Sequence, residues 1–173
     1  MKVLMLSTDR TILKPGSKAA QRLAGYASFA DIKLLMVTKD FFKALREGDE
    51  MLKDFRPDVV SAQDPFLIGV LGVLLARRAK APLQIQIHTD FMSPAYVYES
   101  PRHFVESLIA RWVLPRASCV RVVSQRIADE VKKISKAPVS ILPIRVAPSF
   151  AKASEGKPHD GKPTFITISR LTR

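Results

Sequence analysis

The sequence has very few of the residues that build disulfides and metal sites. Its 173 residues include one cysteine, Cys119, which lies in an apolar segment and is most simply a small core residue. This count excludes a disulfide framework and a cysteine-based zinc site, and it favours a reducing compartment. The three histidines have no ligand spacing to one another, so we expect no metal.

Long apolar runs are also missing. The longest one covers residues 66–76, contains two glycines and is too short to cross a bilayer. The apolar run at 2–6 leads directly into polar residues, which is typical of a buried first strand rather than of a secretory signal. These absences predict a cytoplasmic protein that is either soluble or peripheral to the inner face of the membrane.

Acidic residues are in the minority. The chain has 16 Asp and Glu against 28 Lys and Arg, and its formal net charge is +12. Such an excess favours anionic partners such as nucleic acid, acidic lipid headgroups or phosphorylated small molecules, although a basic solvated surface has the same composition. The sequence contains no helix-turn-helix spacing, RNA-binding aromatic motif or zinc finger, so we expect no nucleic-acid partner.

Short apolar strands alternate with amphipathic helices along the chain. The expected strands are 3–6, 32–37, 58–62, 83–87, 119–123 and 139–142. The expected helices are 17–30, 41–55, 66–79, 101–114 and 125–134. Strands that are apolar throughout are typical of a parallel sheet that is buried on both faces. The alternation predicts an α/β fold with a Rossmann-like, doubly wound parallel sheet.

The composition changes after Leu142, where prolines and lysines become frequent. We expect one domain over residues 1–150, an interdomain linker over 151–163, and the first strand of another domain over 164–173. A lone strand has nothing of its own to pair with. The sequence therefore predicts a second domain that is cut off where it begins.

Polar residues follow several of the expected strands, at the place where open parallel sheets bind ligands. His88 and Asp90 come after the strand 83–87, and a histidine there can exchange a proton near neutral pH. The alternative is that these two residues only cap the following turn. Asp64 and Ser124 come after two other strands, and each has the N-cap of the next helix as its alternative role.

The loop after the first strand ends in Gly16 and Ser17, just before a helix. Backbone N–H groups at a helix N-terminus favour anions, and a glycine lets a ligand approach them. The loop has neither the G-x-G-x-x-G pattern nor the Gly-Lys-Ser/Thr of a Walker loop. An ordinary strand–helix turn remains the alternative.

Six short segments carry a resemblance to a known family. They are RPDVVSAQDP at 56–65, IHTD at 87–90, PRASCV at 115–120, VSQRI at 123–127, ILP at 141–143 and ITISRL at 166–171. In this order, over nearly the whole chain, they resemble the N-terminal half of retaining glycosyltransferases of family 4. These enzymes have the GT-B fold, in which two Rossmann-like domains face each other.

The resemblance implies an N-terminal domain that binds a glycan or lipid-linked acceptor and a C-terminal domain that binds a nucleotide-sugar. The nucleotide-sugar is a substrate, so no cofactor is implied. The resemblance places His88 at the reaction centre and Arg170 on the donor diphosphate, where a guanidinium offsets leaving-group charge. The expected acceptor-binding residues are Gly16, Ser17, Asp64, Asp90 and Ser124.

The chain departs from the family pattern in three places. A paired glycine is usual in the first loop, where this chain has Pro15-Gly16-Ser17. The hinge often reads Pro-Asn-Gly-Val-Asp, and here residues 143–147 read PIRVA. The lysine after the donor arginine and the pair of donor-binding glutamates would fall beyond residue 173. We therefore expect this chain to be inactive by itself.

The expected helix 101–114 has apolar residues along one side and arginines close by. We expect this apolar side to pack on the sheet, as crossover helices do. The alternative is an amphipathic helix that lies on an anionic membrane. In that case the protein would be a non-catalytic basic module that binds a membrane surface or a protein partner.

Overall fold

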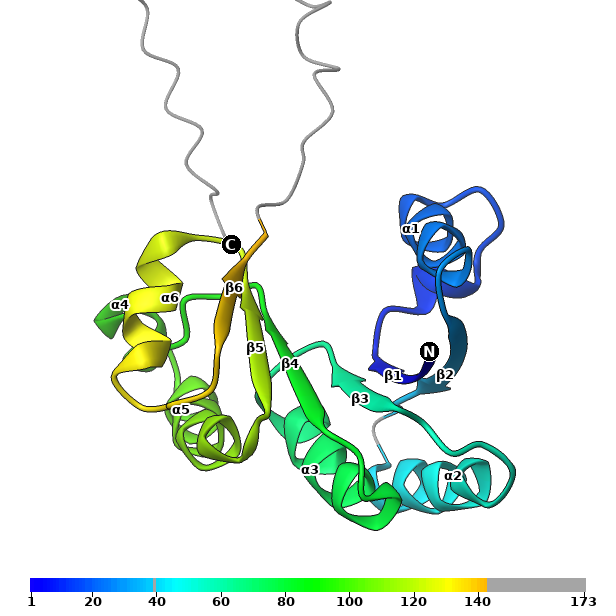
Figure 1. The fold of residues 1–173 in the computed structure, drawn as a ribbon. Coiled ribbons are helices and arrows are strands. Elements are labelled where there is room, and N and C mark those ends of the chain that lie inside the picture. Colours follow the sequence, from blue (N-terminus) through cyan, green and yellow to red (C-terminus); the bar gives the residue numbers. More distant parts are fainter. Residues whose placement is uncertain (39, 143–173) are drawn as a thin grey trace, which may run out of the picture. The chain divides into compact units, whose positions relative to one another are not determined.

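The sheet has six parallel strands in the order β2-β1-β3-β4-β5-β6 (Figure 1). It is formed by residues 1–38 and 40–142, the part of the chain that the computed structural model describes. The predicted Rossmann-like, doubly wound parallel sheet is confirmed. The predicted linker over 151–163, the predicted strand over 164–173 and Arg170 lie outside the described residues.

Each strand and helix that was predicted before residue 143 is present, with ends that differ by a few residues. The strands are β1 (Lys2–Ser7), β2 (Asp31–Met36), β3 (Val59–Ala62), β4 (Leu83–Ile87), β5 (Cys119–Val122) and β6 (Val139–Ile141). The helices are α1 (Lys18–Ala27), α2 (Phe41–Asp54), α3 (Leu67–Ala79), α4 (Pro94–Val97), α5 (Pro101–Val113) and α6 (Gln125–Lys132). Two 3-10 helices, η1 (Arg10–Leu13) and η2 (Leu114–Arg116), complete the described elements. The sequence does not predict α4, η1 or η2, because a single turn is too short to show a periodic pattern.

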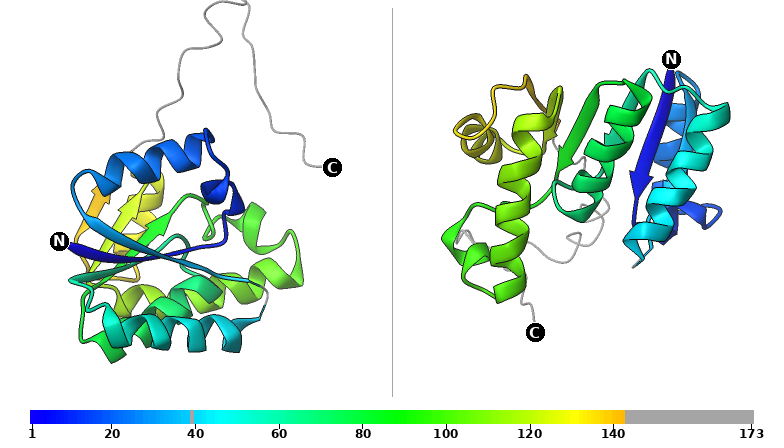
Figure 2. Two further views of the ribbon diagram at one scale, coloured as in Figure 1. Left: turned by 90° about the vertical axis from the view of Figure 1, so that its right-hand side faces the viewer. Right: turned by 90° about the horizontal axis from the view of Figure 1, so that it is seen from below.

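Helices cover the sheet from both sides. Helix α1 lies on one face, while α2, α3 and α5 lie on the other (Figures 1 and 2). The chain passes from β1 outward to β2 and then returns beyond β1 to form β3. The strand order therefore reverses between β1 and β3, and ligands of open α/β sheets bind at the carboxyl edge beside such a reversal.

The two faces of β3 and β4 differ in polarity, which corrects the expectation of strands that are apolar throughout. The face toward α3 carries fully buried apolar side chains such as Val60, Ala62 and Ile85. The opposite face carries Ser61 and, from β4, two glutamines. Only one face of these strands belongs to the apolar core, so the expectation that both faces are apolar is wrong for β3 and β4.

Helix α5 also differs from the sequence-based expectation. It packs inward through Ser107, Ala110 and Val113, all buried, whereas Leu108 and Trp112 on its other side are exposed. The prediction that the apolar side of this helix packs on the sheet is wrong for these exposed residues. The reason is that α5 lies close to α3, and small residues permit that approach.

Gly69 shows how close the approach of α3 to α5 is. A Cβ atom at this position would lie 2.9 Å from Val113 Cγ1 and 3.0 Å from the backbone oxygen of Asp64. We expect Gly69→Ala to lower the free energy of unfolding by about 1–3 kcal/mol, measured by urea denaturation. The control is Gly25→Ala on α1, where a Cβ meets nothing within 4 Å. Alanine should stabilise that helix by about 0.5–1 kcal/mol, and equal effects at both sites would contradict the packing described.

Candidate active site

The loops that follow β1 and β3 are joined at the carboxyl edge of the sheet. The hydroxyl of Ser7 donates a hydrogen bond to Gln63 Oε1 at 2.5 Å and accepts one from the backbone N–H of Asp9 at 3.0 Å. Ser7 is fully buried, and a buried hydroxyl needs such partners. These bonds fix the side chain of Gln63 at the reversal point. Sequence analysis does not single out Gln63, although its position directly after β3 is a signal that could have found it.

The predicted binding residues Gly16 and Ser17 form the turn that opens α1. Gly16 has a φ of 77°, a conformation that favours glycine. The Ser17 hydroxyl donates to the carbonyl of Thr11 at 2.6 Å and accepts from the N–H of Ala20 at 3.0 Å. Ser17 is thus the N-cap of α1, as expected if the loop is an ordinary turn between a strand and a helix. Its role in binding stays a prediction.

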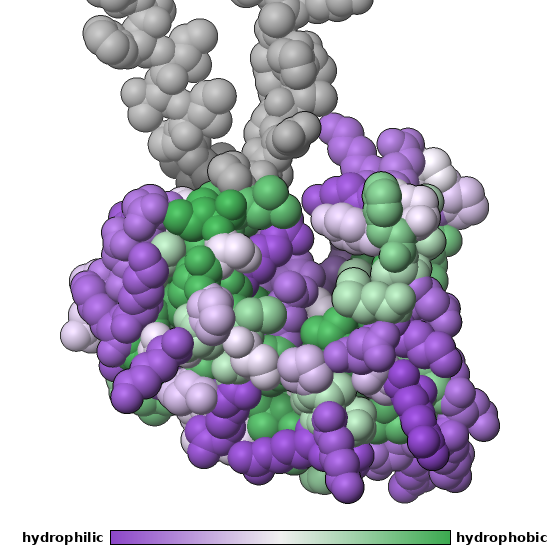
Figure 3. All heavy atoms as spheres, in the orientation of Figure 1, coloured by the Kyte–Doolittle hydropathy of each residue, from purple (hydrophilic) through white to green (hydrophobic). Residues whose placement is uncertain are grey.

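His88 stands at the end of β4, exposed, and follows the polar face of the sheet. Its neighbour on that face, Gln86, donates from Nε2 to the Ser61 hydroxyl at 3.0 Å. Arg121 of β5 donates from Nη1 to Gln86 Oε1 at 3.3 Å. Figure 3 shows hydrophilic atoms gathered in a hollow on this face, between α1 and the β5–β6 side of the sheet. His88 therefore lies at the carboxyl end of the polar face that Ser61, Gln86 and Arg121 form.

Two arginines act electrostatically on His88. Although the His88 side chain is exposed, the protein atoms around its ring partly desolvate it, which lowers the pKa of the imidazole, and the positive charges of Arg121 and Arg22 lower this pKa further. His88 is therefore neutral at pH 7, with one ring nitrogen that donates and one that accepts. The buried Nε of Arg121 has no hydrogen-bond partner among the described residues. Neither arginine was predicted from the sequence, although a charged residue inside the apolar strand β5 is a signal for Arg121.

Asp90 and Ser124 have structural partners. The Asp90 carboxylate forms an ion pair with Arg126 in the first turn of α6, and its own side chain is largely buried. The Asp90 carbonyl accepts the Ser93 hydroxyl at 3.0 Å, which holds the start of α4. The Ser124 hydroxyl accepts the N–H of Ile127 at 3.4 Å, so the alternative role of Ser124 as an N-cap is confirmed. Binding roles for both residues stay predictions.

Asp64 occupies the turn between β3 and α3, and it is not the N-cap of that helix. The N-cap is Phe66, whose N–H donates to Asp64 Oδ1 at 2.8 Å. Burial raises the pKa of the Asp64 carboxyl to about 6, and the nearby charge of Glu106 adds to this effect, while the bond from Phe66 opposes it. Asp64 therefore changes its charge close to neutral pH, which suits a group that exchanges protons.

An aromatic and acidic cluster adjoins Asp64. The Tyr96 hydroxyl donates to Glu106 Oε2 at 2.6 Å. Burial and this hydrogen bond raise the pKa of Tyr96 well above its ordinary value, so the hydroxyl keeps its proton. The Tyr96 ring stacks on His103, with centroids 4.2 Å apart, and on Phe66 at 6.3 Å. This cluster is not predictable from the sequence, because its residues are spread over 64–106 and meet only in the folded chain.

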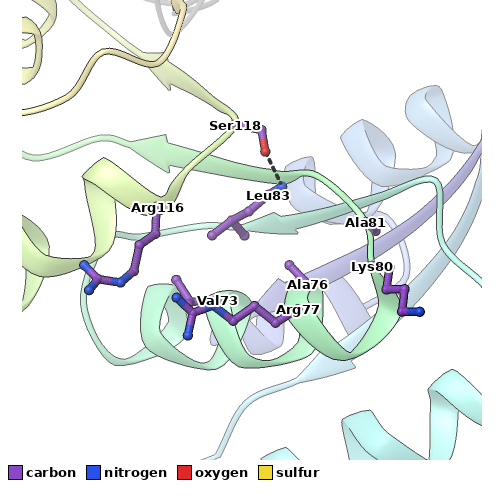
Figure 4. Close-up of a pocket in the computed structure, with 8 residues that line it drawn as sticks. All are labelled: Val73, Ala76, Arg77, Lys80, Ala81, Leu83, Arg116 and Ser118. Atoms are coloured by element: carbon purple, nitrogen blue, oxygen red, sulfur yellow. Dashed lines mark hydrogen bonds between the residues drawn. The ribbon is translucent and has the colours of Figure 1, made fainter.

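A cavity of about 200 Å³ lies elsewhere, at the amino ends of β4 and β5 (Figure 4). Its charged lining residues are Arg77, Lys80 and Arg116. It therefore lies at the sheet edge opposite to His88. Within residues 1–38 and 40–142, no three His, Cys, Asp or Glu side chains are grouped as a metal site, and no helix is long and apolar enough to cross a membrane.

A six-stranded parallel sheet whose strand order reverses beside β1, with helices on both faces, is a Rossmann-like fold. The sequence matches the glycosyl transferase 4-like domain family over residues 17–146, which is most of the chain. The protein belongs to that family. None of the curated proteins is similar enough to count as a match.

Solved structures share the fold at low sequence identity. The structure of Anabaena Alr3699/HepE in complex with UDP and glucose has a TM-score of 0.54 and 16% identity, and the match covers 83% of this chain and 44% of HepE. A UDP-N-acetylglucosamine 2-epimerase has a TM-score of 0.51 and 14% identity, with coverage of 82% and 47%. At such identities the likeness shows the fold. The chain spans less than half the length of these proteins.

Proposed function

We propose that this chain is the acceptor-binding half of a glycosyltransferase that moves a sugar from a nucleotide-sugar to an acceptor hydroxyl. The observation that carries the proposal is the position of His88 at the carboxyl edge of the sheet, after the strand that neighbours β3, in a chain of the glycosyl transferase 4-like family. The UDP and glucose bound to HepE, a protein of similar fold, support a nucleotide-sugar as the donor.

The charges around His88 suit this chemistry. A neutral imidazole can hydrogen-bond a sugar hydroxyl without adding to the positive charge of Arg22 and Arg121. In the retaining reaction that we propose, the acceptor attacks the sugar from the face that the diphosphate leaves, and the donor phosphate helps to take the acceptor proton. The positive charges of Arg22 and Arg121 would stabilise the negative charge of the departing diphosphate. Arg170 would contact the diphosphate from the donor-binding half.

The acidic residues have different proposed roles. Asp64 is partly buried and its pKa is about 6, so its carboxylate can accept a hydrogen bond from an acceptor hydroxyl. Asp90 is held by Arg126, so we assign it to the orientation of the loop that carries His88. Gly16 would let the substrate approach the start of α1, where Ser17 holds the backbone in place.

A transfer assay tests the proposal. The protein that contains this chain together with a donor-binding half, in one polypeptide or two, is incubated with radiolabelled UDP-glucose and UDP-N-acetylglucosamine and a panel of glycan and lipid-linked acceptors. We expect label to move to an acceptor with its anomeric configuration retained, as read by NMR of the product. A folded protein that binds neither nucleotide-sugar nor any acceptor would contradict the proposal and leave the non-catalytic alternative.

A further inference from the structure

The outer side of α5 carries four large apolar side chains that are exposed. Phe104, Val105 and Leu108 are each about half exposed, at 50%, 52% and 50%, and Trp112 is 42% exposed. Leu108 follows Phe104 by four residues and Val105 by three, and Trp112 follows Leu108 by four, which places all of them on one side of the helix. The buried residues Ser107, Ala110 and Val113 lie on the opposite side. A contiguous exposed apolar cluster of this kind marks an interaction surface.

Positive charge borders this surface, which we name the α5 surface and define by Phe104, Val105, Leu108 and Trp112. Arg111 lies in the last turn of the helix beside Trp112. The Arg116 guanidinium lies 4.0 Å from the centre of the Trp112 ring and donates to the Trp112 carbonyl at 2.5 Å. The acidic residue of this helix, Glu106, is turned inward and paired with Tyr96 and Arg102. The border therefore attracts anions.

The cationic cavity continues this border at the end of the helix. Arg116 lines it together with Arg77 and the hydroxyl-bearing Ser118, beside the apolar side chain of Val73. Figure 4 shows the guanidinium groups of Arg77 and Arg116 on the same side of the pocket. Two guanidinium groups that face one space match the oxygens of a phosphate. An apolar surface and a cationic cavity, which share Arg116 at their border, are thus adjacent.

We propose that the α5 surface docks this protein on a bilayer that contains anionic phospholipid. The four apolar side chains enter the boundary between headgroups and acyl chains, while Arg111, Arg116 and Arg77 contact lipid phosphates. Charge selects this occupant over a second copy of the chain, because a copy would bring the same arginines, and a net charge of +12, against each other. The proposal does not depend on sugar transfer.

Trp112 provides a direct test, because it is the one tryptophan of the chain. The full chain is mixed with vesicles of phosphatidylcholine alone or of phosphatidylcholine with phosphatidylglycerol. We expect sedimentation with the phosphatidylglycerol vesicles only, weakened by salt, together with a blue shift of the Trp112 emission. Leu108→Asn should weaken binding about tenfold and Arg111→Ser about fivefold.

Matched substitutions on other helices control for general loss of apolar or positive surface. Phe29→Ser removes a side chain that is 88% exposed just beyond α1, and Arg46→Ser removes an exposed arginine of α2. Both should bind vesicles as the parent chain does, and circular dichroism should show every variant folded. Vesicle binding without a Trp112 shift, equal losses in the controls, or no binding at all would overturn the proposal. The proposal would also be overturned if the chain does not bind vesicles but forms a dimer or a protein complex that Leu108→Asn dissociates.

Discussion

His88→Ala should slow sugar transfer by about 100-fold to 1,000-fold in the protein that contains both halves. The imidazole stands at the end of β4, and its lowered pKa keeps it neutral at pH 7. A neutral ring can hold a sugar hydroxyl in the position it needs for the reaction, and its loss leaves that position unfixed. The loss should fall mainly on kcat, because the contact is strongest when the sugar carries developing charge.

Thr89→Ala is the control for this measurement, since Thr89 is the exposed neighbour of His88 and has no proposed role in binding. Its kcat and KM should match those of the parent protein. The pH profile gives a second readout. Activity that needs the neutral imidazole should hold as the pH falls from 7 and decline only below the ordinary histidine pKa of about 6.5. Unchanged turnover in His88→Ala would remove His88 from the mechanism.

Asp64→Asn should raise the free energy of unfolding at pH 7 by up to about 3 kcal/mol. The pKa of Asp64 is about 6 in the folded chain, against about 3.9 in an unfolded one. Between these pH values the folded protein holds a proton that the unfolded chain has lost, so the stability of the parent falls as pH rises from about 4 to about 6. Asparagine keeps an oxygen for the Phe66 N–H but carries no charge.

Urea denaturation of both proteins across this pH range measures the effect. The free energies of unfolding of variant and parent should be nearly equal at pH 4, and their difference should grow until about pH 7. Above that pH, Asp64 is ionised in both the folded and the unfolded chain, so the difference stays constant. Comparing the two proteins cancels other carboxyls, such as Asp9, whose pKa is lowered by its bonds to Thr11. Glu47→Gln at an exposed position of α2 should show no such trend. A stability difference that does not depend on pH would contradict the raised pKa of the partly buried Asp64.

The sequence is sufficient to predict the sheet and most helix starts, because these depend on local patterns. The strand 83–87 is bounded by a charged turn before it and by His88 after it, and the structure gives the same bounds. Ser124 is the N-cap of α6 because its hydroxyl meets an N–H three residues away. Such signals lie within one turn of chain, so tertiary packing does not alter them.

The site contacts and the exposed side of α5 could not be predicted, because they depend on which segments meet. Gln86 lies opposite Arg121 only through the pairing of β4 with β5. Tyr96 meets Glu106 because α4 folds back onto α5. In α5, small residues and large apolar residues occupy opposite sides, and composition alone favours burial of the large ones. Because α5 packs closely against Gly69 of α3, the side of α5 with small residues is buried and the side with large apolar residues is exposed.

The position of a bound UDP-sugar in a crystal structure of the protein that contains both halves tests the central claim most directly. We expect the sugar at the carboxyl edge of β1, β3 and β4, with a hydroxyl within hydrogen-bond distance of the His88 ring. A UDP-sugar seated instead at the opposite edge of the sheet, against Arg77, Lys80 and Arg116, with His88 far from any ligand atom, would contradict it.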